Sequence, residues 1–205
     1  MNKKEKVAFI EKELNRLIPN PEPALHFKDA YTLLVSVMLS AQCTDARVNK
    51  VTAILFKLAD TPKKMAALSL STIEKTIHSL GFFRVKAKNL KGLSEMIVEK
   101  FSGHVPDNLK DLETLPGVGH KTASVVMAQG FQESAFPVDT HIHRLAKRWG
   151  LSSGKNVEQT EEDLKKAFPK KDWGRVHLQM VLFGRTYCPA RGHKKEECPI
   201  CSQVG

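Results

Sequence analysis

The chain has 205 residues, which is enough for a sizeable core and for one large domain or two small ones. Its 32 lysines and arginines exceed its 22 acidic residues, so the formal net charge is +10 and a polyanionic partner such as a phosphate backbone is favoured. The sequence has no leader-like segment and no apolar run long enough to span a membrane, so we expect a cytoplasmic protein with no membrane partner. Disulfides are then not expected, and the four cysteines need another explanation.

Apolar residues recur mostly at three- and four-residue spacing, and alternating apolar and polar runs are scarce. This pattern predicts an all-α chain. The expected helices cover residues 3–17, 31–39, 45–58, 71–81, 84–101, 109–115, 120–129, 140–149, 157–168 and 173–183.

Three local signals refine the first half of this list. The prolines of segment 19–23 end the first helix and suggest a crossing between two lobes. Segment 31–39 is almost wholly apolar, so its helix should be buried. Ser71 and Glu74 have the spacing of a capping box, and Gly81 suits the end of the helix that they would begin.

The most informative stretch runs Leu-Pro-Gly-Val-Gly-His-Lys over residues 115–121. Its proline stops one helix, and its glycines permit a tight turn with positive φ before the next helix begins. The backbone amides of such a turn suit a DNA phosphate, because the N-terminus of a helix is partly positive. An ordinary connection between two helices is the alternative, since proline and glycine are equally common there.

Two charged residues near this turn suggest chemistry. Lys121 stands in the first turn of the second helix, where the helix dipole and a desolvating pocket would both disfavour a charged amine. A neutral amine can attack an electrophilic sugar carbon and form an imine. Asp139 follows eighteen residues later and could assist proton transfer or stabilise positive charge on a sugar ring. The alternatives are a surface lysine that contacts phosphate and an aspartate that only caps a helix.

Taken together, these residues resemble the endonuclease III family of helix–hairpin–helix DNA glycosylases. The matching stretches span nearly the whole chain and lie at residues 39–45, 115–123, 138–142, 154–159 and 183–185. The resemblance implies a two-lobed all-α fold with DNA between the lobes. Residues 22–132 would form a six-helix barrel that carries the hairpin at about 108–129. Residues 1–21 and 133–205 would form a discontinuous helical domain with a cysteine-rich tail.

The resemblance also implies a bifunctional glycosylase/AP lyase of base excision repair, whose partner is double-stranded DNA with a damaged pyrimidine or an abasic site. An oxidised pyrimidine is flipped out of the duplex, Lys121 expels it by attacking the sugar, and the resulting Schiff base undergoes β-elimination that cuts the strand 3′ to the site. Asp139 assists these steps. The sequence is also compatible with two other functions. A monofunctional adenine-mismatch glycosylase would lack Lys121, and a helix–hairpin–helix module without chemistry would not need Asp139.

Other residues would contact DNA by the same resemblance. Gln42 would fill the space left by the flipped base, and Phe82 would insert as an apolar wedge, although either can also be an ordinary surface or core residue. The basic residues Arg84, Lys86 and Lys88, with Lys91, suit phosphates or a solvated helix face. The remaining predicted DNA-binding residues are Gly117, Val118, Gly119, His120, His141, Arg144 and Arg191.

The cysteines depart from the family pattern, in which C-x6-C-x2-C-x5-C holds a 4Fe–4S cluster. Here nine residues separate Cys188 from Cys198, Cys201 follows, and no fourth cysteine lies beyond it. His193 would complete the set C-x4-H-x4-C-x2-C. Three outcomes stay open, namely Zn²⁺, an iron–sulfur cluster with a histidine ligand, and a tail without metal. Cys43 lies far away in sequence, and we expect it to be a small buried hydrophobe. We further expect a bacterial, nucleoid-associated monomer.

Overall fold

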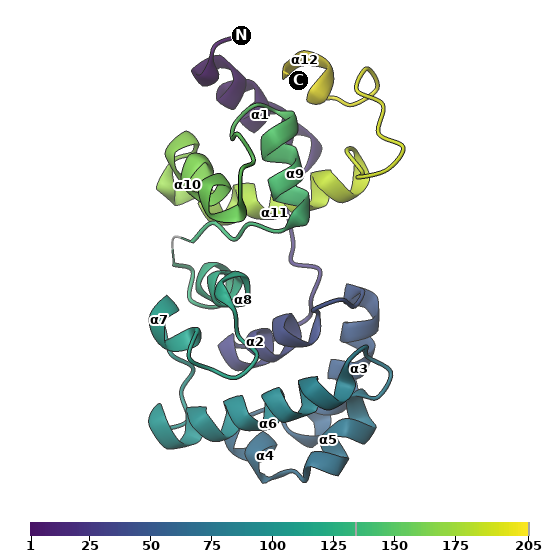
Figure 1. Ribbon diagram of the computed structural model, residues 1–205, viewed down its shortest axis with the longest axis vertical. Helices are drawn as coiled ribbons and strands as arrows, with labels where there is room; N and C mark the ends of the chain where they lie inside the picture. Colours follow the sequence, from purple (N-terminus) through teal and green to yellow (C-terminus); the bar gives the residue numbers. More distant parts are fainter. Residues whose placement is uncertain (134, 205) are drawn as a thin grey trace. The chain divides into compact units, whose positions relative to one another are not determined.

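The structure is a computed structural model, and it describes residues 1–133 and 135–204. Within these residues every regular element is a helix and no strand is present, which confirms the predicted fold class. The chain divides into two compact units (Figure 1). The hairpin unit comprises residues 24–133, and the terminal unit joins residues 1–23 to those after position 133. None of the described helices has the length and apolar character needed to cross a bilayer.

The hairpin unit is built around one apolar helix, α2 (Ala30–Leu39), whose residues from Tyr31 onward are all buried. This helix contacts α3, α6, α8 and the π-helical turn η1, so it has no solvent-facing side (Figure 1). The predicted buried helix is thereby confirmed. The helices of this unit are α2, α3 (Asp45–Leu58), α4 (Pro62–Ala67), α5 (Leu70–Ile77), α6 (Phe83–Lys100), α7 (Leu109–Leu112) and α8 (His120–Val125), followed by η1 (Val126–Gly130).

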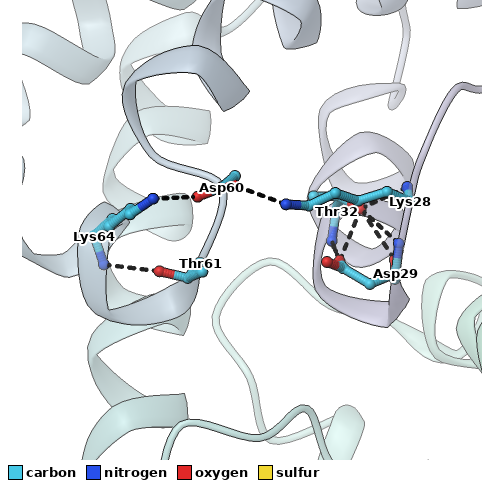
Figure 2. Close-up of polar contacts among 6 residues, drawn as sticks. All are labelled: Lys28, Asp29, Thr32, Asp60, Thr61 and Lys64. Carbon is cyan, nitrogen blue, oxygen red and sulfur yellow. Dashed lines mark hydrogen bonds and ion pairs between the residues drawn. The ribbon is translucent and has the colours of Figure 1, made fainter.

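Side-chain caps begin the neighbouring helices α2 and α4 (Figure 2). Asp29 accepts a hydrogen bond from the backbone N–H of Thr32 at 2.8 Å, and Thr61 accepts one from the N–H of Lys64 at 3.3 Å. Asp60 lies between the two helices and pairs with Lys28 at 2.6 Å and with Lys64 at 2.8 Å. These contacts fix how the loop before α4 meets the start of α2.

The bounds of α5 and the presence of α4 differ from the sequence prediction. Ser69, and not Ser71, caps α5, because its hydroxyl accepts from the N–H of Thr72 at 3.1 Å. Ser71 lies inside the helix, so the predicted capping box of Ser71 and Glu74 is wrong, and the helix ends at Ile77 and not at Gly81. Helix α4 was not predicted, because its six residues are too few to show helical periodicity.

The terminal unit packs helices from both ends of the chain around one core. Its helices are α1 (Lys3–Leu17), α9 (Thr140–Arg148), α10 (Val157–Ala167), the 3₁₀ turn η2 (Lys170–Asp172), α11 (Trp173–Thr186) and α12 (Cys201–Val204). Trp149 and Phe183 are fully buried and meet edge to face, with ring centroids 5.5 Å apart. Cys188, Cys198 and Cys201 belong to the same core, so the cysteine tail packs as part of this unit.

Candidate active site and metal centre

The hairpin turn depends on a glycine in a left-handed conformation. Gly117 has φ +77°, and a Cβ there would lie 2.7 Å from Nδ2 of Asn89 on α6. Both the backbone angle and the close neighbour therefore disfavour a side chain. The N–H of Val118 donates to the carbonyl of Leu115 at 3.0 Å and closes the turn, and Gly119 is the N-cap of α8.

Lys121 is the second residue of α8, and its side chain is exposed. Burial therefore does not desolvate its amine as the sequence analysis expected. The preceding residue is engaged within the hairpin, since Nδ1 of His120 lies 2.6 Å from a carboxylate oxygen of Glu113. This contact ties the start of α8 to the end of α7 and leaves Lys121 accessible on the turn.

Asp139 is the N-cap of α9 and is half-buried. Its Oδ1 accepts a hydrogen bond from the N–H of Ile142 at 2.8 Å. The capping role that the sequence allowed is therefore present. It fixes the carboxylate at the first turn of a helix whose far end is held by the cysteine tail, as described below.

Gln42 and Phe82 share a backbone conformation that is uncommon for residues with side chains. Gln42 has φ +56° and Phe82 has φ +58°, both in the left-handed region. The side chain of Gln42 is exposed, and Phe82 is 67% exposed although it is aromatic. A left-handed non-glycine residue costs about 1 kcal/mol, and such strain is concentrated at functional sites. Phe83, by contrast, is half-buried and stacks under the guanidinium of Arg84.

The basic residues of α6 divide into two groups. Lys88 and Arg84 are exposed and remain compatible with phosphate contacts. Lys86 is only 6% exposed, and its Nζ donates to the carbonyls of Leu39 at 2.9 Å and Ala41 at 2.8 Å. For Lys86 neither predicted alternative holds, because its ammonium group is used inside the protein.

The predicted environments of Lys91 and Cys43 also differ from those in the structure. The Nζ of Lys91 donates to the carbonyls of Ala66 at 2.8 Å and Leu68 at 3.0 Å, at the end of α4. Cys43 is half-buried in the turn after α2, and its Sγ lies 3.2 Å from Nζ of Lys86. The expectation that Cys43 is a buried apolar residue is therefore wrong, because it is only half-buried and its sulfur makes a polar contact.

The residues predicted to bind DNA on α9 are tied to α11. Nη2 of Arg144 donates to the carbonyls of Gly184 at 2.9 Å and Cys188 at 3.0 Å, and it lies 3.1 Å from Nδ1 of His141. A Cβ at Gly184 would lie 3.0 Å from Cβ of His141, which explains why this close approach needs glycine. Arg191 lies in the tail and is exposed. Nη2 of Arg144 thus joins α9 to α11, and Arg191 has the exposure that a DNA contact requires.

Cys188, His193, Cys198 and Cys201 come together in the terminal unit. One ligand atom from each lies within 4.8 Å of all the others, so the four can hold a metal ion. Nε2 of His193 is buried and has no hydrogen-bond partner among the described residues. A buried imidazole nitrogen without a partner is costly, and a metal ion would satisfy it. The structure therefore brings together the set that the sequence spacing suggested.

Polar contacts surround this set. Sγ of Cys188 lies 3.7 Å from Sγ of Cys201, and that contact lowers the pKa of Cys188 to about 5 and raises that of Cys201. Nη1 of Arg148 also donates to Sγ of Cys188 at 3.1 Å and to the carbonyl of Pro189 at 2.9 Å. Arg148 was not among the residues predicted from the sequence, although its position four residues after Arg144, on the same face of α9, was a usable signal.

Comparison with known proteins first defines the class of protein to which this chain belongs. The family described as "HhH-GPD superfamily base excision DNA repair protein" matches residues 35–170. Endonuclease III of Bacillus subtilis (strain 168) is 40% identical over 197 residues, which cover 96% of this chain and 90% of that protein. Two solved structures are also similar. A non-covalent endonuclease III–DNA complex has a TM-score of 0.94 at 38% identity, covering 100% of this chain and 96% of that one. A trapped endonuclease III–DNA covalent intermediate has a TM-score of 0.92 at 39% identity, covering 98% and 94%.

The chain belongs to the endonuclease III family of this superfamily. It is accordingly a base excision repair DNA glycosylase/AP lyase, and neither the adenine-mismatch glycosylase nor the module without chemistry is favoured. The resemblance that rested on the hairpin and on the aspartate motif is thereby confirmed.

Proposed function

We propose that this chain removes oxidised pyrimidines from duplex DNA and cuts the strand 3′ to the resulting abasic site, with Lys121 as the nucleophile. The amine attacks the anomeric carbon of the sugar, the bond to the base breaks, and the base leaves. The C1′–O4′ bond of the sugar then opens as the nitrogen gives up a proton to the ring oxygen, and this produces the imine. The imine acidifies the neighbouring C2′ position, and loss of that proton expels the 3′ phosphate. The observation that carries this proposal is the exposed Lys121 on the Gly117 turn, in a chain 39% identical to an endonuclease III trapped covalently on DNA.

Asp139 supplies the carboxylate of this chemistry. It would accept or steer the proton from the attacking amine and stabilise the positive charge that develops on the sugar. Its bond to the N–H of Ile142 supports the role, because a carboxylate held by one oxygen is oriented before DNA arrives. Lys121 and Asp139 lie in different units, which we propose to be the barrel domain and the discontinuous domain that the resemblance implies.

The hairpin unit would hold the DNA through its turns. The amides of Gly117, Val118 and Gly119, with His120, would bind a phosphate at the start of α8. Gln42 would occupy the space of the flipped base and pair with the orphaned base, while Phe82 would insert between neighbouring bases. Their exposure and left-handed backbone support this proposal, because both turns present a side chain away from the core.

Trapping with borohydride tests the nucleophile. Duplex DNA that carries an oxidised pyrimidine is incubated with the enzyme and borohydride, which reduces the imine to a stable covalent adduct. We expect Lys121→Gln to form no adduct while it still binds DNA. Lys110→Gln is the matched control, because Lys110 is an exposed lysine on the other helix of the hairpin. An adduct of undiminished yield from Lys121→Gln would overturn the assignment.

The tail would be a structural metal centre formed by Cys188, His193, Cys198 and Cys201. Two centres suit three thiolates and an imidazole, namely Zn²⁺ and an iron–sulfur cluster with one histidine ligand. Either would join the end of α11 to α12 through the exposed loop that carries Arg191, which could then contact a phosphate. With bacterial relatives and no membrane-spanning helix among its described residues, the chain would act in the cytoplasm as a nucleoid-associated monomer.

A further inference from the structure

The donor set of the tail departs from what a 4Fe–4S cluster requires. In a cubane each ligand binds a different iron, so the cysteine sulfurs lie farther apart than the ligands of a single ion. Around a single Zn²⁺, with bonds of about 2.3 Å to sulfur and 2.0–2.1 Å to nitrogen, tetrahedral geometry places the ligand atoms about 3.5–3.8 Å apart. Here all four ligand atoms lie within 4.8 Å of one another, and the sulfurs of Cys188 and Cys201 are 3.7 Å apart.

We infer that this chain holds one Zn²⁺ ion at Cys188, His193, Cys198 and Cys201, where its family has an iron–sulfur cluster. The inference rests on the metal centre proposed above and names its occupant. Three cysteines with one histidine are a common structural zinc set, and the buried Nε2 of His193 supplies the fourth bond. The N–H of Cys201 lies 3.5 Å from Sγ of Cys198, so the short Cys-x2-Cys loop already folds around its first sulfur. Arg148, beside Sγ of Cys188, would offset the negative charge of three thiolates on one divalent ion.

Elemental analysis of the full chain, purified without oxygen and without added metal, tests the occupant. We expect about one zinc per chain, no acid-labile sulfide and no broad visible absorbance. About four iron atoms and four sulfide ions per chain would overturn the assignment of zinc, but the proposal of a metal centre would stand. The absence of both metals, with unchanged melting of Cys201→Ser, would overturn the centre itself. Cys43→Ser is the matched control, because Cys43 lies in the hairpin unit and should leave the zinc content unchanged.

A separate observation concerns the buried Lys86, which contacts both of the exposed turns in the hairpin unit. Its Nζ donates to the carbonyls of Leu39 and Ala41, so it holds the chain on the N-terminal side of Gln42. Its own backbone N–H donates to the carbonyl of Phe82 at 3.0 Å, as the first bond of α6. One residue therefore connects two turns that are separated by about forty positions in sequence and that both carry strained, exposed side chains.

We propose that Lys86 is a positioning residue that sets the spacing of Gln42 and Phe82 for entry into DNA. The proposal rests on the DNA contacts proposed for these two residues. A left-handed residue after a helix relaxes unless its surroundings hold it, and three donor contacts from one ammonium to Leu39, Ala41 and Cys43 supply that restraint. The contacts are desolvated, which makes them rigid, because the side chain is only 6% exposed.

Lys91 offers a matched control for this proposal. It lies on the same helix, and its Nζ also donates to two carbonyls at the end of a helix, those of Ala66 and Leu68. Neither of these residues is proposed to contact DNA. Lys86→Met and Lys91→Met each remove one ammonium group and leave two carbonyls without that donor, so both should lower the melting temperature.

The two variants should differ in their affinity for four duplexes, each with an abasic site opposite a different base. We expect Lys86→Met to lose about tenfold in affinity and most of its dependence on the opposite base, while Lys91→Met keeps both. In a Gln42→Ala background the effect of Lys86→Met on opposite-base dependence should vanish. Equal behaviour of the two lysine variants would overturn the proposal, and Lys86→Gln, which removes the charge and shortens the side chain, serves if Lys86→Met fails to fold. Borohydride adducts at Lys121 from the wild type show independently whether the proposed chemistry stands.

Discussion

The hairpin turn and the cysteine tail differ in how many parts of the chain they need. The hairpin is local, since the turn from Leu115 to Gly119 closes through one backbone hydrogen bond and approaches one other helix, α6, at Asn89 and Gly92. The tail is assembled from three directions. Arg148 on α9 reaches Cys188, Lys6 on α1 donates to the carbonyl of Val204 at 2.8 Å, and the end of α11 supplies the first ligand.

This difference predicts different consequences for substitution. A local turn with an exposed lysine can lose its chemistry without losing its fold, because few other contacts depend on it. A composite tail that belongs to the core of its unit should lose stability first. Helix α9 is informative in this respect, because Asp139 begins it and Arg148 ends it.

The largest expected effect is on Asp139 at the start of α9, where one substitution distinguishes a catalytic role from a capping role. Asparagine caps a helix about as well as aspartate, so Asp139→Asn should leave the melting temperature unchanged. Base release should nevertheless fall by about 100-fold, the scale of general acid–base contributions. Single-turnover assays on DNA with an oxidised pyrimidine measure it. Turnover close to that of the wild type would show that Asp139 only caps α9.

The next effect concerns the other end of α9. Arg148→Met removes the donor to Sγ of Cys188 and to the carbonyl of Pro189, and we expect a loss of about 2–3 kcal/mol in the free energy of unfolding. Denaturant unfolding with metal present measures it. Arg191→Met is the control, because Arg191 is exposed and should change stability by less than about 0.5 kcal/mol. Equal stability of both variants would contradict a tail built on α9.

A smaller loss is expected within the hairpin. Gly117→Ala places a methyl group against Asn89 on a backbone with φ +77°, so it should cost about 1–2 kcal/mol and weaken DNA binding. Gly174→Ala is the control, because a Cβ at Gly174 meets no atom within 4 Å, its backbone is not left-handed, and it lies on α11 in the terminal unit. If Gly117→Ala bound DNA as tightly as Gly174→Ala, the turn would not be a phosphate contact.

The smallest effect lies outside both regions, at Asp60 between α2 and α4. Hydrogen bonds from Lys28 and Lys64 hold the pKa of Asp60 below its usual range. Because the folded pKa is depressed, the stabilisation is present above the unfolded pKa of about 3.9 and is lost as the pH falls through the folded value. Asp60→Asn should therefore lower the melting temperature at pH 7 by about a degree, and the difference should shrink as the pH falls below about 3.9. Melting curves at pH 7 and at acidic pH test this, and a difference that does not shrink in acid would contradict the ion pairs as its source.

The sequence already revealed the features that depend on local periodicity and turn chemistry. Helical spacing established the all-α class, the apolar segment 31–39 established the buried helix α2, and the glycine turn located the hairpin beside Lys121. The sequence periodicity did not reveal the short helices. The six residues of α4 and the four of α12 present less than two turns of pattern, so their helical state depends on what packs against them.

Tertiary structure decided which polar groups face solvent and which are used inside the protein. In sequence, Lys86, Lys88 and Lys91 look alike, and only the fold brings carbonyl groups to Lys86 and Lys91 while it leaves Lys88 exposed. The left-handed backbone of Gln42 and Phe82 has no signature in residue type, and only the fold brings Lys86 to the carbonyls beside Gln42. The ligand separations at Cys188 likewise depend on three helices that meet, so spacing alone could name the four ligands but could not choose their metal.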